Sequence, residues 1–294
     1  GSIIKKITVD TAGDNGLSSP IAVSTNNDFN IDVVYAGDLK GNVWRFDLTS
    51  VNSTDWIYSK LFSTEGSRPI TGAITVGNHP ANLNGRVVYF GTGEYLQPSD
   101  LSDSATEYFY AIADNDSCLS ATACVHSSQL ISQTIDSAEK TGRTISNHRI
   151  DWQQDKGWRL PLSAINGVAE RVVGRPLLIG SQLVFNSIVP SSDRCNSGGE
   201  TFTYSLNRNN GGLVKAPTID FNADGLVDQN DNVEGNLVVA GRLDSVSDIN
   251  DDPIPELIIL SSADGQKRCV NVAGRCMMIE SPDRSGRVSW LQIK

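Results

Sequence analysis

The chain contains one short segment whose oxygen atoms are spaced to hold a metal ion. Counting from residue 220, side-chain oxygens stand at positions 1, 3, 5 and 9, on Asp220, Asn222, Asp224 and Asp228. Alternate residues turn these oxygens inward, Gly225 at position 6 allows the sharp bend, and Leu226 at position 7 offers its backbone carbonyl. Because Ca²⁺ takes ~6 to 8 oxygen ligands whereas Mg²⁺ demands octahedral geometry, the pattern predicts a calcium site.

Two other interpretations concern the same segment. Asp, Asn and Gly also favour solvated turns that bind no metal. Asp231, at position 12, stands where a helix-flanked calcium loop carries Glu, but no amphipathic helix flanks this loop. Asp231 therefore ranks below Asp228 as a ligand.

A second acidic segment repeats the same spacing. Its positions 1, 3, 5 and 9 are Asp248, Asn250, Asp252 and Glu256. Pro253 replaces the glycine at the bend, and proline does not easily supply that conformation, so a rigid turn before a strand is favoured over a metal site. A fainter version around Asn26, Asp28 and Asp32 is expected to be only a turn.

The five cysteines allow disulfides but do not form a zinc motif. They are Cys118 and Cys124, a lone Cys195, and Cys269 and Cys276, without paired short spacings or a nearby His. Each close pair could form a disulfide loop in an oxidising compartment. Cross-pairing and five buried thiols are the alternatives.

No recognisable catalytic motif is present in the sequence. The three His, at 79, 126 and 148, lie far apart and none stands beside a Ser or Cys nucleophile motif. Gly91-Thr92-Gly93 lacks the further glycines of a dinucleotide fingerprint and is interpreted as a strand-end turn. We expect that the protein is not an enzyme; a quinoprotein-like propeller enzyme is the alternative, because such propellers share Trp and Gly-Asx repeats.

Composition and charge limit the classes of partner. The 294 residues include 34 Asp and Glu against 24 Lys and Arg, and the resulting net charge of −10 argues against nucleic acid and suits a cation. No apolar run approaches the ~18 residues of a membrane span, so the chain is not expected to cross a membrane.

The elements that must position these residues are strands. Helical periodicity is almost absent, and short runs of β-branched and aromatic residues recur between Gly, Asn, Asp and Ser clusters, which predicts an all-β fold. The runs form four sets: 20–24, 33–36, 42–46 and 58–62; 70–76, 86–91, 108–111 and 129–134; 171–179, 182–188 and 201–206; and 237–242, 256–260 and 288–293. Such sets indicate the blades of a β-propeller, with a β-sandwich as the alternative. Segments 97–107 and 136–157 are expected to be exposed loops.

Several motifs occur along most of the chain. The most specific is Tyr35-Ala-Gly-Asp-Leu-Lys-Gly-Asn-Val-Trp-Arg-Phe-Asp47, in which Asp38 is expected to accept backbone N–H groups and Trp44 and Phe46 to face a core. Others are Val88-Tyr-Phe-Gly-Thr-Gly-Glu-Tyr-Leu96, Gly157-Trp-Arg-Leu160, Arg171-Val-Val-Gly-Arg-Pro176 and Gly286-Arg-Val-Ser-Trp290. Together they resemble the PilY/PilC family of type IV pilus biogenesis factors and tip-associated adhesins.

This resemblance implies that residues 1–294 form the C-terminal blades of a larger, seven-bladed type of propeller, without its N-terminal blades and variable adhesive region. It implies an extracellular protein at the pilus tip or outer-membrane surface of a Gram-negative bacterium, secreted through the periplasm. Such a protein binds Ca²⁺, promotes pilus assembly, counters retraction and supports twitching motility and adhesion. Minor pilins or a tip complex are the implied partners, with a host-cell receptor as a further candidate and a purely structural tip subunit as the alternative role. An incomplete propeller is expected to expose unpaired strand edges.

Overall fold

The computed structural model describes residues 2–26, 28–82, 84–115, 118, 122–138, 142–191, 199–220, 226–232, 236–243, 258–261, 268–272 and 275–279. At 137–138, and from residue 242 onward, it describes the backbone alone. Within this part of the chain the regular elements are β-strands and short 3-10 helices. The 3-10 helices are η1 (Ser53–Asp55), η2 (Glu65–Ser67), η3 (Pro98–Ser102), η4 (Ser127–Gln129) and η5 (Gln229–Asp231).

The first sheet is an antiparallel meander that confirms the first predicted set. Its strands, in spatial order, are β1 (Ile21–Val23), β2 (Val33–Gly37), β3 (Asn42–Asp47) and β4 (Ile57–Ser63). A tight turn joins β2 to β3, and Gly41 in that turn has a φ of +75°. A Cβ at Gly41 would lie 2.0 Å from the Thr64 hydroxyl, so glycine is required there for both conformation and space.

The second sheet contains a strand that the predicted set omitted. Its order is β5 (Thr75–Asn78), β6 (Arg86–Gly91), β7 (Tyr108–Asp114), β11 (Gly157–Pro161) and β8 (Ile131–Ser132). β11 pairs antiparallel with β7 and parallel with β8, and therefore lies between two strands that follow each other in the predicted set.

The third sheet overturns two predictions. Its order is β12 (Leu177–Ile179), β13 (Gln182–Val189), β14 (Glu200–Asn207), β15 (Ala240–Leu243), β10 (Gly142–Ile145) and β9 (Ile135–Ala138). Segment 136–157 is not simply an exposed loop, because it contributes β10 and most of β9 as a hairpin that pairs with β15. The run 237–242 belongs to this sheet rather than to the last set, because β15 pairs with β14.

The fourth sheet consists of β16 (Ile258–Ser261), β17 (Arg268–Val272) and β18 (Arg275–Ile279), which are antiparallel in that order. Of these strands only β16 was predicted. The predicted run 288–293 lies outside the described residues.

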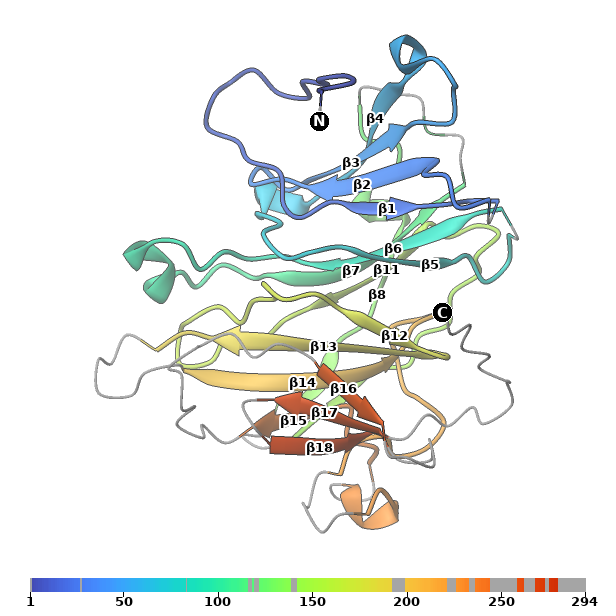
Figure 1. The fold of residues 1–294 in the computed structure, drawn as a ribbon. Helices are drawn as coiled ribbons and strands as arrows, with labels where there is room; N and C mark the ends of the chain where they lie inside the picture. Colours follow the sequence, from blue (N-terminus) through green and yellow to red (C-terminus); the bar gives the residue numbers. More distant parts are fainter. Residues whose placement is uncertain are drawn as a thin grey trace.

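The first three sheets follow one another through the molecule like consecutive blades (Figure 1). Alternate residues of β6 pack in opposite directions: Val88 and Phe90 belong to a core shared with the first sheet, and Val87 and Tyr89 to a core shared with the third. This two-sided burial explains the uninterrupted apolar run in β6. The β-propeller prediction is confirmed and the β-sandwich alternative is wrong.

One long excursion of the second sheet, residues 115–156 between β7 and β11, reaches both neighbouring sheets. Near its start, Cys124 and Val125 donate backbone N–H groups to the carbonyls of Lys60 and Leu61, at 3.1 and 2.9 Å, along the outer edge of β4. Further on, β10 pairs with β15. The excursion therefore covers part of each of these two strand edges, and the open edges expected of an incomplete propeller stay a prediction.

Candidate metal site and the polar network around Asp38

The residues that lead into the predicted calcium loop are firmly anchored. Thr218 and Ile219 are buried, and the Thr218 hydroxyl is 2.7 Å from the Ser205 hydroxyl on β14. Asp220 follows directly, so the first predicted ligand starts from a fixed point of the third sheet.

The end of the loop is fixed by a capped turn. The Asp228 carboxylate accepts the backbone N–H of Asn230 at 2.8 Å, and the Asp228 N–H donates to the Asp231 carboxylate at 2.8 Å. This reciprocal arrangement is the capping box of η5. Asp231 is 2% exposed, so its carboxylate has a structural role that needs no metal.

The middle of the loop lies outside the described residues. Of the predicted ligands, Asp220, Leu226 and Asp228 are described, whereas Asn222 and Asp224 are not. The donors are all oxygens, which suits a hard cation such as Ca²⁺. Among the described residues no three His, Cys, Asp or Glu side chains are grouped so that they could hold a metal ion. The calcium site therefore stays a prediction that rests on spacing and on two anchored ends.

The other two acidic segments differ in outcome. Asp248, Asn250, Asp252 and Glu256 all lie outside the described residues. In the fainter segment, Asp32 accepts the backbone N–H and the hydroxyl of Thr25, at 2.6 and 2.7 Å. Asp28 accepts the backbone N–H of Asn30 at 2.8 Å, so these carboxylates shape a turn, as expected.

Asp38 is the centre of a buried hydrogen-bond network in the motif 35–47. Its carboxylate is fully buried and accepts the backbone N–H groups of Lys40 and Asn42, at 3.0 and 2.8 Å. It also accepts the Trp44 indole N–H at 2.7 Å and the Asn15 side chain at 2.9 Å. The expected structural role of Asp38 is confirmed, because these donors fix the turn and the orientation of Trp44 in one core with Phe46.

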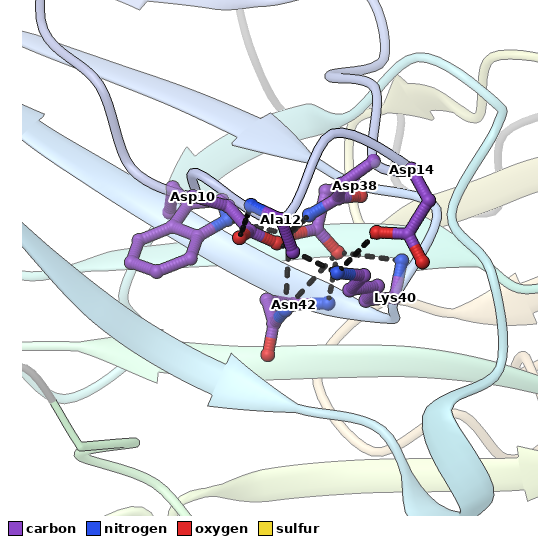
Figure 2. Close-up of polar contacts among 8 residues, drawn as sticks. Asp10, Ala12, Asp14, Asp38, Lys40 and Asn42 are labelled. Carbon is purple, nitrogen blue, oxygen red and sulfur yellow. Dashed lines mark hydrogen bonds and ion pairs between the residues drawn. The ribbon is translucent and has the colours of Figure 1, made fainter.

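An ion-pair cluster lies beside Asp38 and ties the N-terminal segment to the first sheet. Figure 2 shows Lys40 extending toward Asp10 and Asp14, which it contacts at 3.0 and 2.7 Å. The Ala12 backbone N–H, Lys40 and Asn15 together lower the pKa of Asp10 to about 2. Lys40 is itself the cation that the two carboxylates neutralise. This cluster therefore fastens residues 10–15 to the first sheet.

Two buried charged networks were not singled out from the sequence. In one, Arg45 on β3 pairs with Asp114 on β7. In the other, Glu170 lies beside Arg143, Ser187 and Tyr204, and the Arg143 guanidinium lies 3.8 Å from the Phe202 ring centre. Arg45 follows the buried Val43 on one face of β3, and Arg143 precedes the buried Ile145 on one face of β10. A charged residue beside a buried apolar one on the same strand face is the signal that could have identified them.

Cys118 and Cys124 are joined by a disulfide that closes a loop of the excursion. The Cys118 sulfur contacts the Lys60 carbonyl at 3.5 Å, beside the segment that covers β4. The side chains of Cys269 and Cys276 and the whole of Cys195 lie outside what the structure describes. In the backbone register, Cys269 is opposite Met278 and Cys276 is opposite Asn271.

The three histidines have local partners in different places. His79 accepts the Ala81 backbone N–H at 3.1 Å and packs edge-on against Trp152. His148 Nδ1 lies 2.9 Å from the Ser132 carbonyl, and His126 precedes η4. The structure does not bring these three side chains into one site.

The sequence of the chain is similar to those of known pilus proteins. A family model described as the PilY1 beta-propeller domain matches residues 1–148. The type IV pilus biogenesis factor PilY1 of Pseudomonas aeruginosa is 27% identical over 342 residues, which cover 100% of this chain and 29% of the relative. A PilY1 homolog of Xylella fastidiosa is 30% identical over 219 residues, which cover 69% of this chain and 15% of the relative.

The crystal structure of the Pseudomonas aeruginosa PilY1 C-terminal domain has a similar fold. The TM-score is 0.74 at 24% identity, and the match covers 92% of this chain and 62% of that one. The chain thus spans less than a third of the length of the Pseudomonas relative. Among the described residues, no helix is long and apolar enough to cross a membrane.

Proposed function

Because the chain belongs to the PilY1 β-propeller family of type IV pilus biogenesis factors, we propose that it is the calcium-binding propeller of a protein at the pilus tip or outer-membrane surface. In this proposal the protein promotes pilus assembly, counters retraction, and supports twitching motility and adhesion. Its partners are minor pilins or the complex at the pilus tip, and a host-cell receptor is a second class of partner.

The observation that carries the calcium part of the proposal is the oxygen spacing over 220–228 between two anchored ends. Thr218 and Ile219 hold the start, and the capped turn at Asp228 and Asp231 holds the end. Holding both ends lowers the entropic cost of closing the intervening residues around an ion. The net charge of −10 further favours cation uptake.

Calcium acts in this proposal as a regulatory ligand rather than as a catalyst. When Ca²⁺ binds Asp220, Asn222, Asp224, the Leu226 carbonyl and Asp228, it orders the loop against the third sheet. Occupancy then shifts the propeller between two functional states, one of which counters retraction.

Isothermal calorimetry tests the calcium site directly. Asp224→Ala removes the central ligand and is expected to abolish the heat of Ca²⁺ binding seen with the unaltered chain. Asp28→Ala is the matched control, because Asp28 stands in a similar acidic turn whose oxygens already accept local N–H groups. Undiminished binding by the Asp224 variant would disprove the assignment.

The partner class is tested by capture experiments with the same chain. Immobilised chain is incubated with purified minor pilins or with host-cell surface proteins, each with Ca²⁺ and with chelator. Calcium-dependent retention of the minor pilins supports the pilus-tip role. Retention of only the host proteins would contradict it and favour an adhesin.

A further inference from the structure

Two connecting segments meet the chain where β6 ends: one runs from β4 to β5 and the other from β11 to β12. The Gly93 N–H donates to the Pro69 carbonyl at 2.8 Å, and the Val172 N–H donates to the Thr92 carbonyl at 3.0 Å. Gly93 has a φ of +124°, and a Cβ there would lie 2.3 Å from the Arg171 Cβ. Gly91 ends β6 and Gly93 forms an isolated parallel bridge with Ile70, so this segment is not the expected strand-end turn. Glycine at position 93 is what allows Arg171 to lie against it.

Arg171 holds the connection between β6 and β7 at both of its ends. The residue is 1% exposed, and its guanidinium donates to the carbonyl of Glu94 at 2.8 Å and to that of Asp103 at 3.4 Å. A third bond reaches the Ala169 carbonyl at 3.3 Å. These three acceptors are backbone dipoles, not carboxylates, so the bonds that fix the connection do not neutralise the cation fully.

The connection itself, residues 94–106, projects from the sheets with η3 near its tip (Figure 1). The Asp100 carboxylate accepts the backbone N–H groups of Leu96 and Gln97, at 2.8 and 2.9 Å. The Leu96 side chain is 63% exposed. The connection thus presents an apolar side chain on a loop with a defined conformation, held by Arg171 at its base.

Glu107 lies at the base of the same connection and is 3% exposed. Its Oε2 has no hydrogen-bond partner within the described part of the chain. Thr92 hydrogen-bonds the carboxyl, while Arg68, Asp103 and Arg171 act on it through their charges. Burial is the largest influence and raises the pKa of Glu107 to about 7.

We propose that Glu107 and Arg171 form a proton-dependent switch that sets the order of residues 94–106. With Glu107 neutral, Arg171 holds the carbonyls of Glu94 and Asp103 as in the structure. Ionisation of Glu107 places a carboxylate with an unpaired oxygen in a buried site, and the charge is relieved when a guanidinium turns toward it or water enters. Either response weakens the bonds from Arg171 to the connection and loosens it.

The sign of the pH dependence follows because the structure, in which Arg171 holds the 94–106 connection, favours protonated Glu107. We call this arrangement the closed state. The closed state is most stable below the ordinary pKa of a solvated Glu, ~4.3, and its stability falls as the pH rises through the pKa of Glu107 in the folded chain. Because the pKa of Glu107 rises from ~4.3 to about 7, the equilibrium constant for closing falls by up to roughly tenfold for each pH unit between these two values. The pKa of Glu94 is also raised, chiefly by burial. Asp100, Arg171 and Asp103 act on Glu94 through their charges, so its titration must be distinguished from that of Glu107.

Amide hydrogen exchange of residues 94–106 between pH 5 and 8 tests the switch. After correction for the intrinsic pH dependence of exchange, protection in the unaltered chain is expected to fall on the order of fiftyfold. Glu107→Gln is expected to remove this fall, because it cannot ionise. Glu94→Gln is the matched control and is expected to retain it. The inference does not depend on calcium, and chelator is present throughout.

The proposal is overturned if the unaltered chain shows no corrected change in protection across this range, a result that needs no variant to fold. It is also overturned if Glu107→Gln retains the fall, or if Glu94→Gln alone removes it. Thermal unfolding of each variant at pH 5 establishes that its exchange reports on a folded chain.

Discussion

Arg45 on β3 and Asp114 on β7 form an ion pair at 2.8 Å that joins the first sheet to the second, with side chains only 3% and 1% exposed. The Tyr35 hydroxyl donates to the same Asp114 oxygen at 2.6 Å. A charge pair at this depth has lost nearly all of its hydration, so each partner depends on the other. The contact between these two sheets is therefore sensitive to single substitutions.

Arg45→Met is expected to destabilise the chain by about 3–5 kcal/mol, because the buried Asp114 carboxylate loses its ion pair with the Arg45 guanidinium. The double variant with Asp114→Leu is expected to recover part of that loss, since the buried carboxylate is then removed as well. Denaturant unfolding measures both. Equal loss in the single and double variants would show that the charge itself is not what matters.

Asp38→Ala is expected to cost about 2–4 kcal/mol, because the backbone N–H of Asn42 and the indole of Trp44 lose a buried acceptor. Tryptophan fluorescence should also change as Trp44 loses its fixed orientation. Asp28→Ala, in an exposed turn, is the control and should change unfolding by less than about 0.5 kcal/mol. A similar small effect at Asp38 would contradict its central role.

Acid should release the N-terminal segment before it unfolds the sheets. The pKa of Asp10 is lowered, so its contribution is present above the ordinary value near 3.8 and is lost as pH falls toward about 2. Limited proteolysis with pepsin should cut residues 2–16 progressively faster from pH 4 to pH 2. Lys40→Met should allow the same cutting already at pH 4.

Reduction should loosen the segment that covers β4. Without the Cys118–Cys124 disulfide, the short loop regains conformational freedom, and a loss of about 2 kcal/mol is expected. Hydrogen exchange at Cys124 and Val125 should rise on addition of reductant. Cys118→Ser should show the raised exchange from the start and no further response to reductant.

Calcium should raise the thermal unfolding midpoint if the loop 220–228 binds it only in the folded chain. At a free concentration 100 times the dissociation constant, the gain is about 2.7 kcal/mol. Chelator should return the midpoint to its calcium-free value. Asp224→Ala should show one midpoint under both conditions, and a calcium response that survives this substitution would place the ion elsewhere.

Local features were predictable from the sequence because their causes lie within a few residues. Gly41, Asp38 and Trp44 belong to one turn and one strand, so spacing alone indicated their roles. The alternation around β2, β3 and β6 likewise follows from the two-residue period of a strand. The oxygen spacing of 220–228 is also local, so it predicts the ligands without the rest of the fold.

Pairing between distant segments was not predictable. β9 and β10 leave the second sheet and join the third, where their acceptor β15 lies far along the chain. No local pattern distinguishes that hairpin from an exposed one. Glu107 and Arg171 were missed as a pair for a similar reason, since their relation depends on how two blades pack rather than on either segment.

The excursion 115–156 is not synthesised at the same time as the strand edges that it contacts. For a chain that emerges from its N-terminal end, β4 is complete at Ser63, but its cover at Val125 arrives 62 residues later (125 − 63 = 62). The hairpin that ends at Ile145 in turn precedes its acceptor at Ala240 by 95 residues (240 − 145 = 95). The uncovered edge of β4 and the unpaired hairpin are therefore exposed one after the other during synthesis, and the nascent chain is most vulnerable to misassembly within these two intervals.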